Sequence, residues 1–505
     1  MIKFLTKYHK WLSISITIFI LLFAISGIVL NHRSLVSLID VNRNLLPEKY
    51  QYNNWNLGSV KGMVKISEDK FLIYGNIGIY LTDKNFNRFQ NFNAGFGKGV
   101  DNHKVYKVIK THDGKLFAGT LFGLFCFDDK EGRWEKIPLK LRNPAIMDII
   151  EVGDTLYVLS RSFLFKSTDF HTFHKFILPP PEGYDNKVGL FKTLWLIHSG
   201  EIYGSAGKLI VDMVGIIFTF LTITGLFLFV NSYRLKDDNK KRRELIQIQK
   251  SQKWNLKWHN RVGWINLVVL IITVSTGMFL RPPLLISIST ERVKKIPHTI
   301  LDTNNAWFDK LRGIVYDDSK NCFYIATIDG VYCTDIDFNS PLKYLYPQPP
   351  ISVMGVNVFK KVNKDEILIG SFEGLFLWNV NSGSIHDYIK KKPLEESGNN
   401  GSQIGDELVS GYILNGDMEI YFDFNKGAKK ISGEKNFPSM PPEIKNQPMS
   451  LWNVMLEIHT GRIFEPILGL FYILIVPLVG LTLLFILISG FIVWFTVFRG
   501  KNGSI

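Results

Sequence analysis

The sequence predicts a membrane protein of mixed fold class: a bundle of four transmembrane helices, built as two tandem two-helix repeats, plus an extracytoplasmic β-propeller of about six to seven blades. Three observations predict it. Four hydrophobic runs are each about long enough to cross a bilayer. The two long segments between them carry strand–turn motifs at the spacing of propeller blades. The helical runs also fall into two pairs with matching sequence elements.

Composition excludes several classes of protein. Hydrophobic residues make up 46% and charged residues 21%, which excludes a disordered chain and also one that is membrane-embedded throughout. The three cysteines are too few and too scattered for a disulfide framework or a Cys-based zinc site. The formal charge of +14 could indicate nucleic acid or a membrane surface, so the location of the basic residues has to decide.

The hydrophobic runs are residues 11–30, 213–230, 262–280 and 466–498. Each is about as long as a transmembrane helix or longer. The last exceeds one straight span, so we expect a kink at Pro477 or a start outside the bilayer. The first could instead be a signal peptide, because Lys3, Lys7 and Lys10 precede it and small residues follow at 24–26. The tandem repeat favours a retained helix.

Basic residues set the orientation. The linker 232–261 carries ten Lys and Arg against three acids, and both termini are basic, so the positive-inside rule places all three in the cytoplasm. Much of the basic surplus is therefore topological, which argues against nucleic acid as a partner and for a multi-pass membrane protein. The predicted transmembrane helices are 1–31, 191–231, 259–283 and 451–498, the propeller halves 32–190 and 284–450, the basic linker 232–258 and the cytoplasmic tail 499–505.

The two outer segments contain internal repeats. Residues 72–80 match 117–125, and 324–332 match 367–376: each has a β-rich strand, a small residue, a turn closed by glycine and an aromatic. The closing glycines are Gly78, Gly123, Gly330 and Gly374, at spacings of 45 and 44 residues. This period is typical of a four-stranded blade, and the repeats resemble those in sensor regions of some two-component regulators. Because neither segment holds enough blades alone, we expect both to form one ring. Antiparallel sandwich domains are the alternative.

Histidines occupy matching places in the two helical halves. His9 opens the first helix and lies 18 residues before Gly27, and His259 lies 18 residues before Gly277 in the third. Before the second and fourth helices stand the elements His198-Ser-Gly and His459-Thr-Gly, and those helices close on Thr224-Gly225 and Ser489-Gly490. Two halves of the same orientation imply a pseudo-twofold axis along the membrane normal.

That axis predicts His9 opposite His259 near the cytoplasmic face and His198 opposite His459 near the outer face. Two facing imidazoles between small residues suit a six-coordinate haem iron, so we predict one or two haem b groups, with the glycines admitting the macrocycle. The alternative is that each histidine simply lies at the membrane interface. The arginines that could neutralise propionates are Arg33, Arg261, Arg281 and Arg462.

Two further points bear on this prediction. His32 has no counterpart in the second half, where Pro282 stands, and it is the alternative ligand. An unbroken helix from His198 to Gly225 would be about 40 Å long. The second pair therefore requires a break at the His-Ser-Gly and His-Thr-Gly steps.

These histidine and Ser/Thr-Gly elements, and the four helices that carry them, resemble the PepSY-associated transmembrane proteins. That family includes di-haem ferric-siderophore reductases of bacterial inner membranes. The resemblance implies an oxidoreductase of the ferric-chelate reductase type, acting in iron uptake. Family members usually carry PepSY modules outside the membrane, where this chain has propeller-like repeats.

We therefore expect a membrane electron carrier that passes electrons to an extracytoplasmic acceptor such as ferric iron in a siderophore. The sequence has no Gly-x-Gly-x-x-Gly or Walker loop between a strand and a helix, so the donor would be a separate flavoprotein, reduced flavin or quinol. Membrane lipid and an outer protein are further expected partners. The alternative is a membrane-anchored propeller sensor or scaffold without redox activity.

Overall fold

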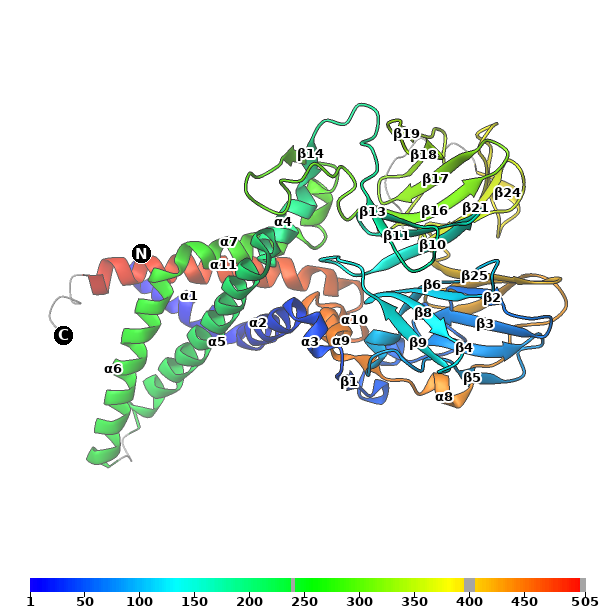
Figure 1. Cartoon of the computed structure of the whole chain (residues 1–505). Helices are drawn as coiled ribbons and strands as arrows, with labels where there is room; N and C mark the ends of the chain where they lie inside the picture. The colour runs from blue at the N-terminus through cyan, green and yellow to red at the C-terminus, as the bar shows by residue number, and fades with distance from the viewer. Residues whose placement is uncertain (238–240, 395–404, 500–505) are drawn as a thin grey trace. The chain divides into compact units, whose positions relative to one another are not determined.

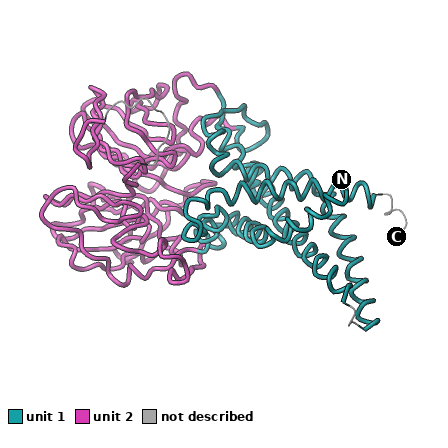
Figure 2. Tube along the Cα trace, turned by 180° about the vertical axis from the view of Figure 1, so that it is seen from behind, with its two compact units in different colours: residues 1–36, 186–302, 451–505 teal, residues 37–185, 303–450 magenta. Residues whose placement is uncertain are grey.

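The computed structural model of the chain describes residues 1–237, 241–394 and 405–499. Residues 238–240 of the predicted basic linker and 500–505 of the predicted cytoplasmic tail lie outside the described residues. The chain forms two compact units (Figure 2): unit 1 comprises residues 1–36, 186–302 and 451–505, and unit 2 comprises residues 37–185 and 303–450. Residues 284–302, which the sequence analysis assigned to the propeller, fold with unit 1, where β14 (Lys187–Gly189) pairs with β15 (Arg292–Lys294).

Unit 1 is helical (Figure 1). Its helices are α1 (Ile2–Ser15), α2 (Thr17–Asn31), α3 (Arg33–Val36), α4 (Leu190–His198), α5 (Gly204–Arg234), α6 (Arg242–Ile265), α7 (Leu267–Phe279), α9 (Leu451–His459), α10 (Glu465–Leu468) and α11 (Ile475–Val493). Two helical segments, 201–234 and 462–498, are long and apolar enough to cross a membrane. Two bent pairs, α1 with α2 and α6 with α7, raise the number to four if each is one span. The helices bury apolar side chains against one another, as a membrane bundle does.

The first and third predicted spans are bent, not straight. The bend is 61° between α1 and α2 and 67° between α6 and α7. At each bend a side chain bonds to the carbonyl four residues back: Thr17 Oγ1 donates to Ser13 O at 2.8 Å, and Asn266 Nδ2 donates to Val262 O at 2.9 Å. Such bonds compete with the helical ladder and bend helices. The two breaks are equivalent in the repeat, since Ile16 and Asn266 each lie seven residues after a paired histidine.

The helix contacts follow the internal repeat. Helix α1 packs on α11 of the other half, as α6 packs on α5, and α2 packs on α9 as α7 packs on α4. Within each half, α2 contacts α5 and α7 contacts α11. Each of these contacts thus has a counterpart in the other half, which is what an internal twofold axis requires.

The fourth hydrophobic run is interrupted earlier than Pro477. The short helix α10 ends at Leu468, Gly469 takes a positive φ of 54°, and a 3₁₀ turn at Gly469–Leu474 leads into α11. Pro477 lies in the first turn of α11, where its missing N–H costs no helical hydrogen bond. A kink at Pro477 is therefore not needed, because the run begins with a separate turn.

Unit 2 consists of antiparallel sheets that follow the predicted repeats (Figure 1). Three come from the first segment: β2 (Gly62–Lys65), β3 (Lys70–Gly75), β4 (Gly78–Asp83) and β5 (Phe89–Asn91); β6 (Val105–Lys110), β7 (Leu116–Thr120), β8 (Gly123–Asp128) and β9 (Arg133–Ile137); β10 (Ile146–Val152), β11 (Thr155–Ser160), β12 (Leu164–Ser167) and β13 (His174–Phe176). Three come from the second: β16 (Leu311–Asp317), β17 (Cys322–Thr327), β18 (Val331–Asp335) and β19 (Lys343–Tyr344); β20 (Val358–Lys361), β21 (Glu366–Ser371), β22 (Gly374–Asn379), β23 (Ile385–Asp387) and β24 (Lys392–Pro393); β25 (Val409–Asn415), β26 (Met418–Asp423) and β27 (Gly427–Ser432). A two-stranded pairing of β1 (Asp40–Val41) with β28 (Met449–Ser450) and the short helix α8 (Pro442–Lys445) complete the unit.

The first strands of these six sheets form a closed ring within the described residues. Strand β2 contacts β6, β6 contacts β10, β10 contacts β16, β16 contacts β20, β20 contacts β25, and β25 returns to β2. The ring takes three sheets from each outer segment. A sheet of this size cannot bury both faces by itself, so each sheet is covered by its neighbours. The glycines Gly78, Gly123 and Gly374 each start the third strand of a sheet with positive φ.

Two buried tryptophans stand where the two chain segments join in the ring. Trp307 is 1% exposed, and its indole Nε1 donates to Pro179 O at 2.7 Å between the β10–β13 and β16–β19 sheets. Trp55 is fully buried, and its Nε1 donates to Pro438 O at 2.7 Å between the β2–β5 and β25–β27 sheets. Each indole buries a large apolar area, and its N–H, the single polar group of the ring, donates to a proline carbonyl. The same kind of contact therefore stabilises both junctions.

We expect Trp307→Ala to lower the free energy of unfolding of unit 2 by about 3–5 kcal/mol, because it leaves a large cavity and an unpaired carbonyl. Denaturant unfolding of the full chain in detergent, followed by circular dichroism in the strand region, measures the change. Leu45→Ala is the control, since Leu45 is 80% exposed. Equal unfolding midpoints for the two variants would contradict the expectation.

Candidate functional site

Two pairs of histidines meet inside unit 1. In the first pair, His9 on α1 and His259 on α6 have ring centroids 6.4 Å apart and ring planes at 88°. In the second pair, His198 and His459 end α4 and α9, with centroids 6.0 Å apart and planes at 48°. Each pair joins equivalent positions of the two halves, as the internal repeat predicted.

The helix breaks required for the second pair are present. Gly200 (φ 73°) and Gly461 (φ 75°) follow the two histidines in the left-handed conformation, which glycine adopts without steric cost. A Cβ on Gly200 would collide with the carbonyl of Gly207. Helix α4 therefore ends at His198 and the long helix α5 begins afresh at Gly204.

Each imidazole is held at Nδ1 by a Ser/Thr-Gly element on a different helix. The contacts are His9 with Ile486 O (3.0 Å) and Ser489 Oγ (3.3 Å), His259 with Thr224 Oγ1 (2.9 Å), His198 with Thr273 O (3.0 Å) and Thr276 Oγ1 (3.5 Å), and His459 with Phe23 O (3.1 Å) and Ser26 Oγ (2.9 Å). In three of the four sets the carbonyl belongs to the residue three positions before the hydroxyl residue. The four sets are therefore copies of one arrangement.

These contacts fix which ring nitrogen carries the proton. A carbonyl oxygen can only accept, so Nδ1–H must donate to it. The hydroxyls also accept, because Ser26 Oγ donates its own hydrogen to Leu22 O (2.6 Å) and Thr224 Oγ1 donates to Phe220 O (2.8 Å). The lone pair of each imidazole is then on Nε2. A histidine anchored in this way at Nδ1 is prepared to bind a metal ion through Nε2.

The glycines of these elements make room for the imidazoles. A Cβ on Gly277 would lie 2.6 Å from His198 Cε1, and one on Gly490 would lie 2.8 Å from His9 Cε1. On Gly27 the corresponding distance to His459 is 3.2 Å, and on Gly225 the distance to His259 is 3.5 Å. The sequence analysis assigned the glycines to the approach of a macrocycle, but the nearest atoms belong to the histidines.

The ring separations suit an ion held between two imidazoles. A metal–nitrogen bond is about 2 Å and a ring nitrogen lies about 1.1 Å from the centroid, so two opposed imidazoles on one ion have centroids about 6 Å apart. The separations of 6.4 Å and 6.0 Å agree with this value. Two protein ligands per ion leave the remaining coordination positions to a cofactor such as a porphyrin. Each pair therefore has the spacing of two imidazoles that bind one metal ion.

His32 belongs to neither pair. Its Nε2 lies 2.7 Å from Asp212 Oδ2 on α5, and Asn31 Nδ2 donates to Asp212 Oδ1 at 3.0 Å. The carboxylate of Asp212 thus bonds to Nε2 of His32, the ring nitrogen that would have to bind iron if His32 were a haem ligand. His32 is better explained as a tie between α2 and α5.

The four arginines predicted near the cofactor are in different surroundings. Arg462 pairs with Glu457 at 2.6 Å. The Arg33 guanidinium lies 3.8 Å above the Trp452 ring, and that of Arg261 lies 5.4 Å above the Trp258 ring. Arg281 is half-buried. Stacking on indole orients a guanidinium but leaves its in-plane donors available.

Sequence reasoning missed the role of the Ser/Thr-Gly elements. It read each one as the end of the helix that begins with a histidine. In the structure every element serves a histidine of another helix: His9 docks on Ser489-Gly490, and His459 docks on Ser26-Gly27. The sequence signal that could have revealed this role is the equal number of histidines and Ser/Thr-Gly elements. There are four of each, so each histidine can dock on one element.

The apolar helices and the ring of sheets define the class: a membrane protein with a β-rich, propeller-like domain. The chain belongs to the PepSY-associated transmembrane family, because the model of the PepSY-associated TM region matches residues 166–497. The resemblance seen in the sequence is thereby confirmed.

Several solved structures are similar to part of this chain. The extracellular domain of the putative one component system BT4673 from B. thetaiotaomicron has 12% identity and a TM-score of 0.34, covering 77% of this chain and 40% of that one. This chain thus spans well under half of the length of that protein. YCF48 bound to D1 peptide has 7% identity and a TM-score of 0.32, with coverage of 76% and 98%. The WD40 β-propeller domain of Doa1 has 9% identity and a TM-score of 0.33, with coverage of 76% and 98%. No curated protein matches the chain.

Proposed function

We propose that this protein is a haem-containing electron carrier of the bacterial inner membrane. One haem b would be held by His9 and His259 and a second by His198 and His459, and electrons would pass across the membrane to an extracytoplasmic acceptor. The observation that carries the proposal is the geometry of the two pairs: rings 6.4 Å and 6.0 Å apart, each anchored at Nδ1 with the lone pair on Nε2.

Haem iron, when bound, supplies the one-electron chemistry, and the chain positions it. The carbonyl and hydroxyl acceptors at Nδ1 hold each ring in one orientation and increase the basicity of Nε2. Apolar side chains of the bundle, among them Ile20, Phe218 and Leu270, keep the surroundings at low dielectric. With a haem bound at each of the two histidine pairs, the bundle would contain two redox sites for electron transfer.

The donor would dock on the cytoplasmic side. We place both termini and the basic linker in the cytoplasm, and the propeller outside, on the distribution of Lys and Arg. The start of α6 presents exposed cations: Arg242, Arg243, Lys250, Lys253 and Lys257. This surface suits an acidic flavoprotein, while reduced flavin or quinol are the small-molecule alternatives. Ferric iron in a siderophore is the acceptor that the family resemblance suggests, which would make the protein a ferric-chelate reductase.

The test is a reduced-minus-oxidised optical spectrum of the full-length protein purified from haem-replete cells. We expect the bands of a six-coordinate b-type haem and up to two haems per chain. A colourless preparation would remove the carrier proposal and leave a membrane-anchored sensor or scaffold, in which the helices anchor the β-rich unit.

A further inference from the structure

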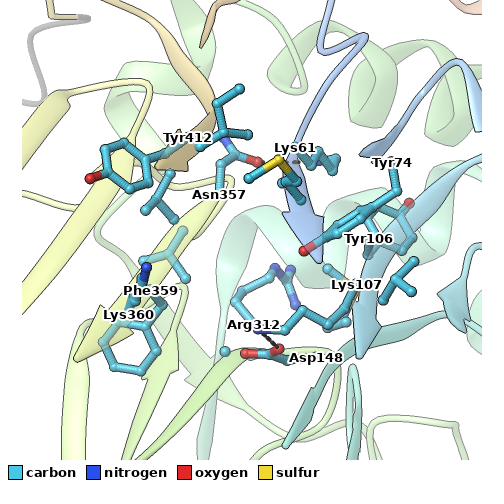
Figure 3. Close-up of a pocket in the computed structure, with 18 of the residues that line it drawn as sticks. Lys61, Tyr74, Tyr106, Lys107, Asp148, Arg312, Asn357, Phe359, Lys360 and Tyr412 are labelled. Atoms are coloured by element: carbon cyan, nitrogen blue, oxygen red, sulfur yellow. Dashed lines mark hydrogen bonds and ion pairs between the residues drawn. The ribbon is translucent and has the colours of Figure 1, made fainter. Parts of the chain in front are cut away.

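A cavity of about 470 Å³ lies within unit 2, where the first strands of the six sheets come together. Strands on different sides of the ring line it, with Lys107 on β6, Asp148 on β10, Arg312 on β16, Lys360 on β20 and Tyr412 on β25. Figure 3 shows these side chains around one space. The volume is in the range of small-molecule sites.

The lining is strongly cationic. Five cations, Lys61, Lys107, Arg161, Arg312 and Lys360, face one lining carboxylate, Asp148. Two of the five have acidic partners: Lys107 Nζ lies 3.0 Å from Asp148 Oδ1, and Arg161 Nη1 lies 3.4 Å from an oxygen of Asp309. For Lys61, Arg312 and Lys360 no carboxylate of the described residues lies within 4 Å of the charged nitrogens.

Arg312 is built into this position. Its Nε donates to Met354 O at 3.3 Å, and its Nη1 donates to Leu311 O at 2.8 Å and Asp309 O at 3.1 Å. Gly355 has a φ of 91°, and a Cβ there would collide with the aliphatic stem of Arg312. Only 8% of Arg312 is exposed. The fold thus orients the guanidinium with neutral acceptors, and the carboxylates of Asp309 and Asp329 act on its charge without forming an ion pair with it.

Lys61 is oriented similarly. Its Nζ donates to Asn357 Oδ1 at 3.1 Å and lies 5.4 Å above the ring of Tyr106. Burial, and secondly the charge of Lys104, lowers the pKa of Lys61 to about 8. Burial, and secondly the charge of Arg161, lowers the pKa of Arg312 to about 10. Holding five cations around one cavity with fewer carboxylates than cations costs free energy, and a bound anion would offset that cost.

We propose that this cavity binds a small polyanion, a molecule with two or more carboxylate or phosphate groups. Lys61, Arg312 and Lys360, which form no ion pair with a described carboxylate, can each meet a separate anionic group, and the volume restricts the ligand to a small molecule. The site lies wholly within unit 2 and does not depend on the haem proposal.

The experiment is titration calorimetry of full-length protein in detergent with citrate, pyrophosphate and inorganic phosphate at constant ionic strength. We expect saturable binding of citrate or pyrophosphate, tighter than that of phosphate. Lys61→Met and Lys360→Met should each weaken binding about tenfold or more. Lys70→Met is the matched control, because Lys70 is an exposed lysine of β3 outside the cavity lining, and it should leave binding unchanged.

The pH dependence offers a second measurement. Citrate binding should weaken as the pH rises from about 7 to about 9, because Lys61 loses its proton near its pKa of about 8. Lys104, Tyr106 and Asn357 are the polar groups that face Lys61. Lys61→Arg keeps the charge and should remove most of this dependence.

Two results would overturn the proposal. One is the absence of saturable binding of all three anions at concentrations up to about 10 mM. The other is binding that Lys61→Met, Lys360→Met and Lys70→Met all reduce equally, which would indicate a general effect of net charge. Circular dichroism of each variant establishes that the β-rich unit remains folded, and a haem spectrum is not needed for either result.

Discussion

Replacing His259 by alanine is expected to remove about half of the bound haem while the second pair keeps its own. His259 shares a cofactor only with His9, and a single remaining imidazole holds a six-coordinate iron poorly. The measurement is the haem content per chain of the purified variant, determined from the spectrum of its pyridine complex. The same variant should lose one of two redox potentials in a titration.

Matched variants make this expectation specific. His198→Ala and His459→Ala should give the same spectral loss as each other, because they share the second pair. His32→Ala is the control: it is a histidine at the end of a helix in the same bundle, but Asp212 holds its ring, so haem content should not change. Unchanged haem in His259→Ala would refute the assignment of the first pair. A loss in His32→Ala together with only one of His198→Ala and His459→Ala would make His32 a ligand.

Replacing Gly277 by alanine is expected to disrupt the second pair almost as strongly as removing a histidine. The new methyl group would lie 2.6 Å from His198 Cε1, closer than such atoms can approach, and Gly277 lies within α7, where the backbone cannot move aside. His198 would be displaced from Thr273 O and Thr276, and its ring would no longer lie 6.0 Å from that of His459. We expect the loss of about half of the haem at retained helix content.

Gly225→Ala provides the comparison at the equivalent element. There the added methyl would lie 3.5 Å from His259 Cε1, an ordinary van der Waals contact, and alanine favours the helix. Haem content and spectrum should match those of the unmodified protein. If Gly277→Ala and Gly225→Ala have the same haem content, the close contact between glycine and imidazole is not what positions the histidine pairs.

Much of the fold could be predicted from the sequence because its signals are local or periodic. Hydrophobic length identified the apolar helical segments, and the glycines Gly78, Gly123 and Gly374 marked strand starts at one period. The internal repeat was sufficient to pair His9 with His259 and His198 with His459, since equivalent residues meet across a twofold axis.

Other features of the site could not be predicted, because they depend on contacts between distant segments. The Nδ1 acceptor of His9 is Ile486, 477 positions away, and no pattern near either residue indicates the contact. Nothing in the composition of 16–17 or 266 marks a break of 61° or 67°, because polar back-bonding residues are common in straight helices. The sequence analysis assigned residues 284–302 to the propeller, but they fold with unit 1. The reason is that β15 pairs with β14, a strand about 100 residues earlier in the chain.

The sequence by itself determined the apolar helical segments, the strand repeats and which histidines are equivalent, because hydrophobic length and periodicity are carried by neighbouring residues. Only the tertiary structure decided that glycines receive imidazoles, that Nε2 is the available nitrogen, and that Lys61, Arg312 and Lys360 surround one cavity. Those features arise when a ring closes or helices of opposite halves pack, and a one-dimensional pattern does not specify which distant atoms then become neighbours.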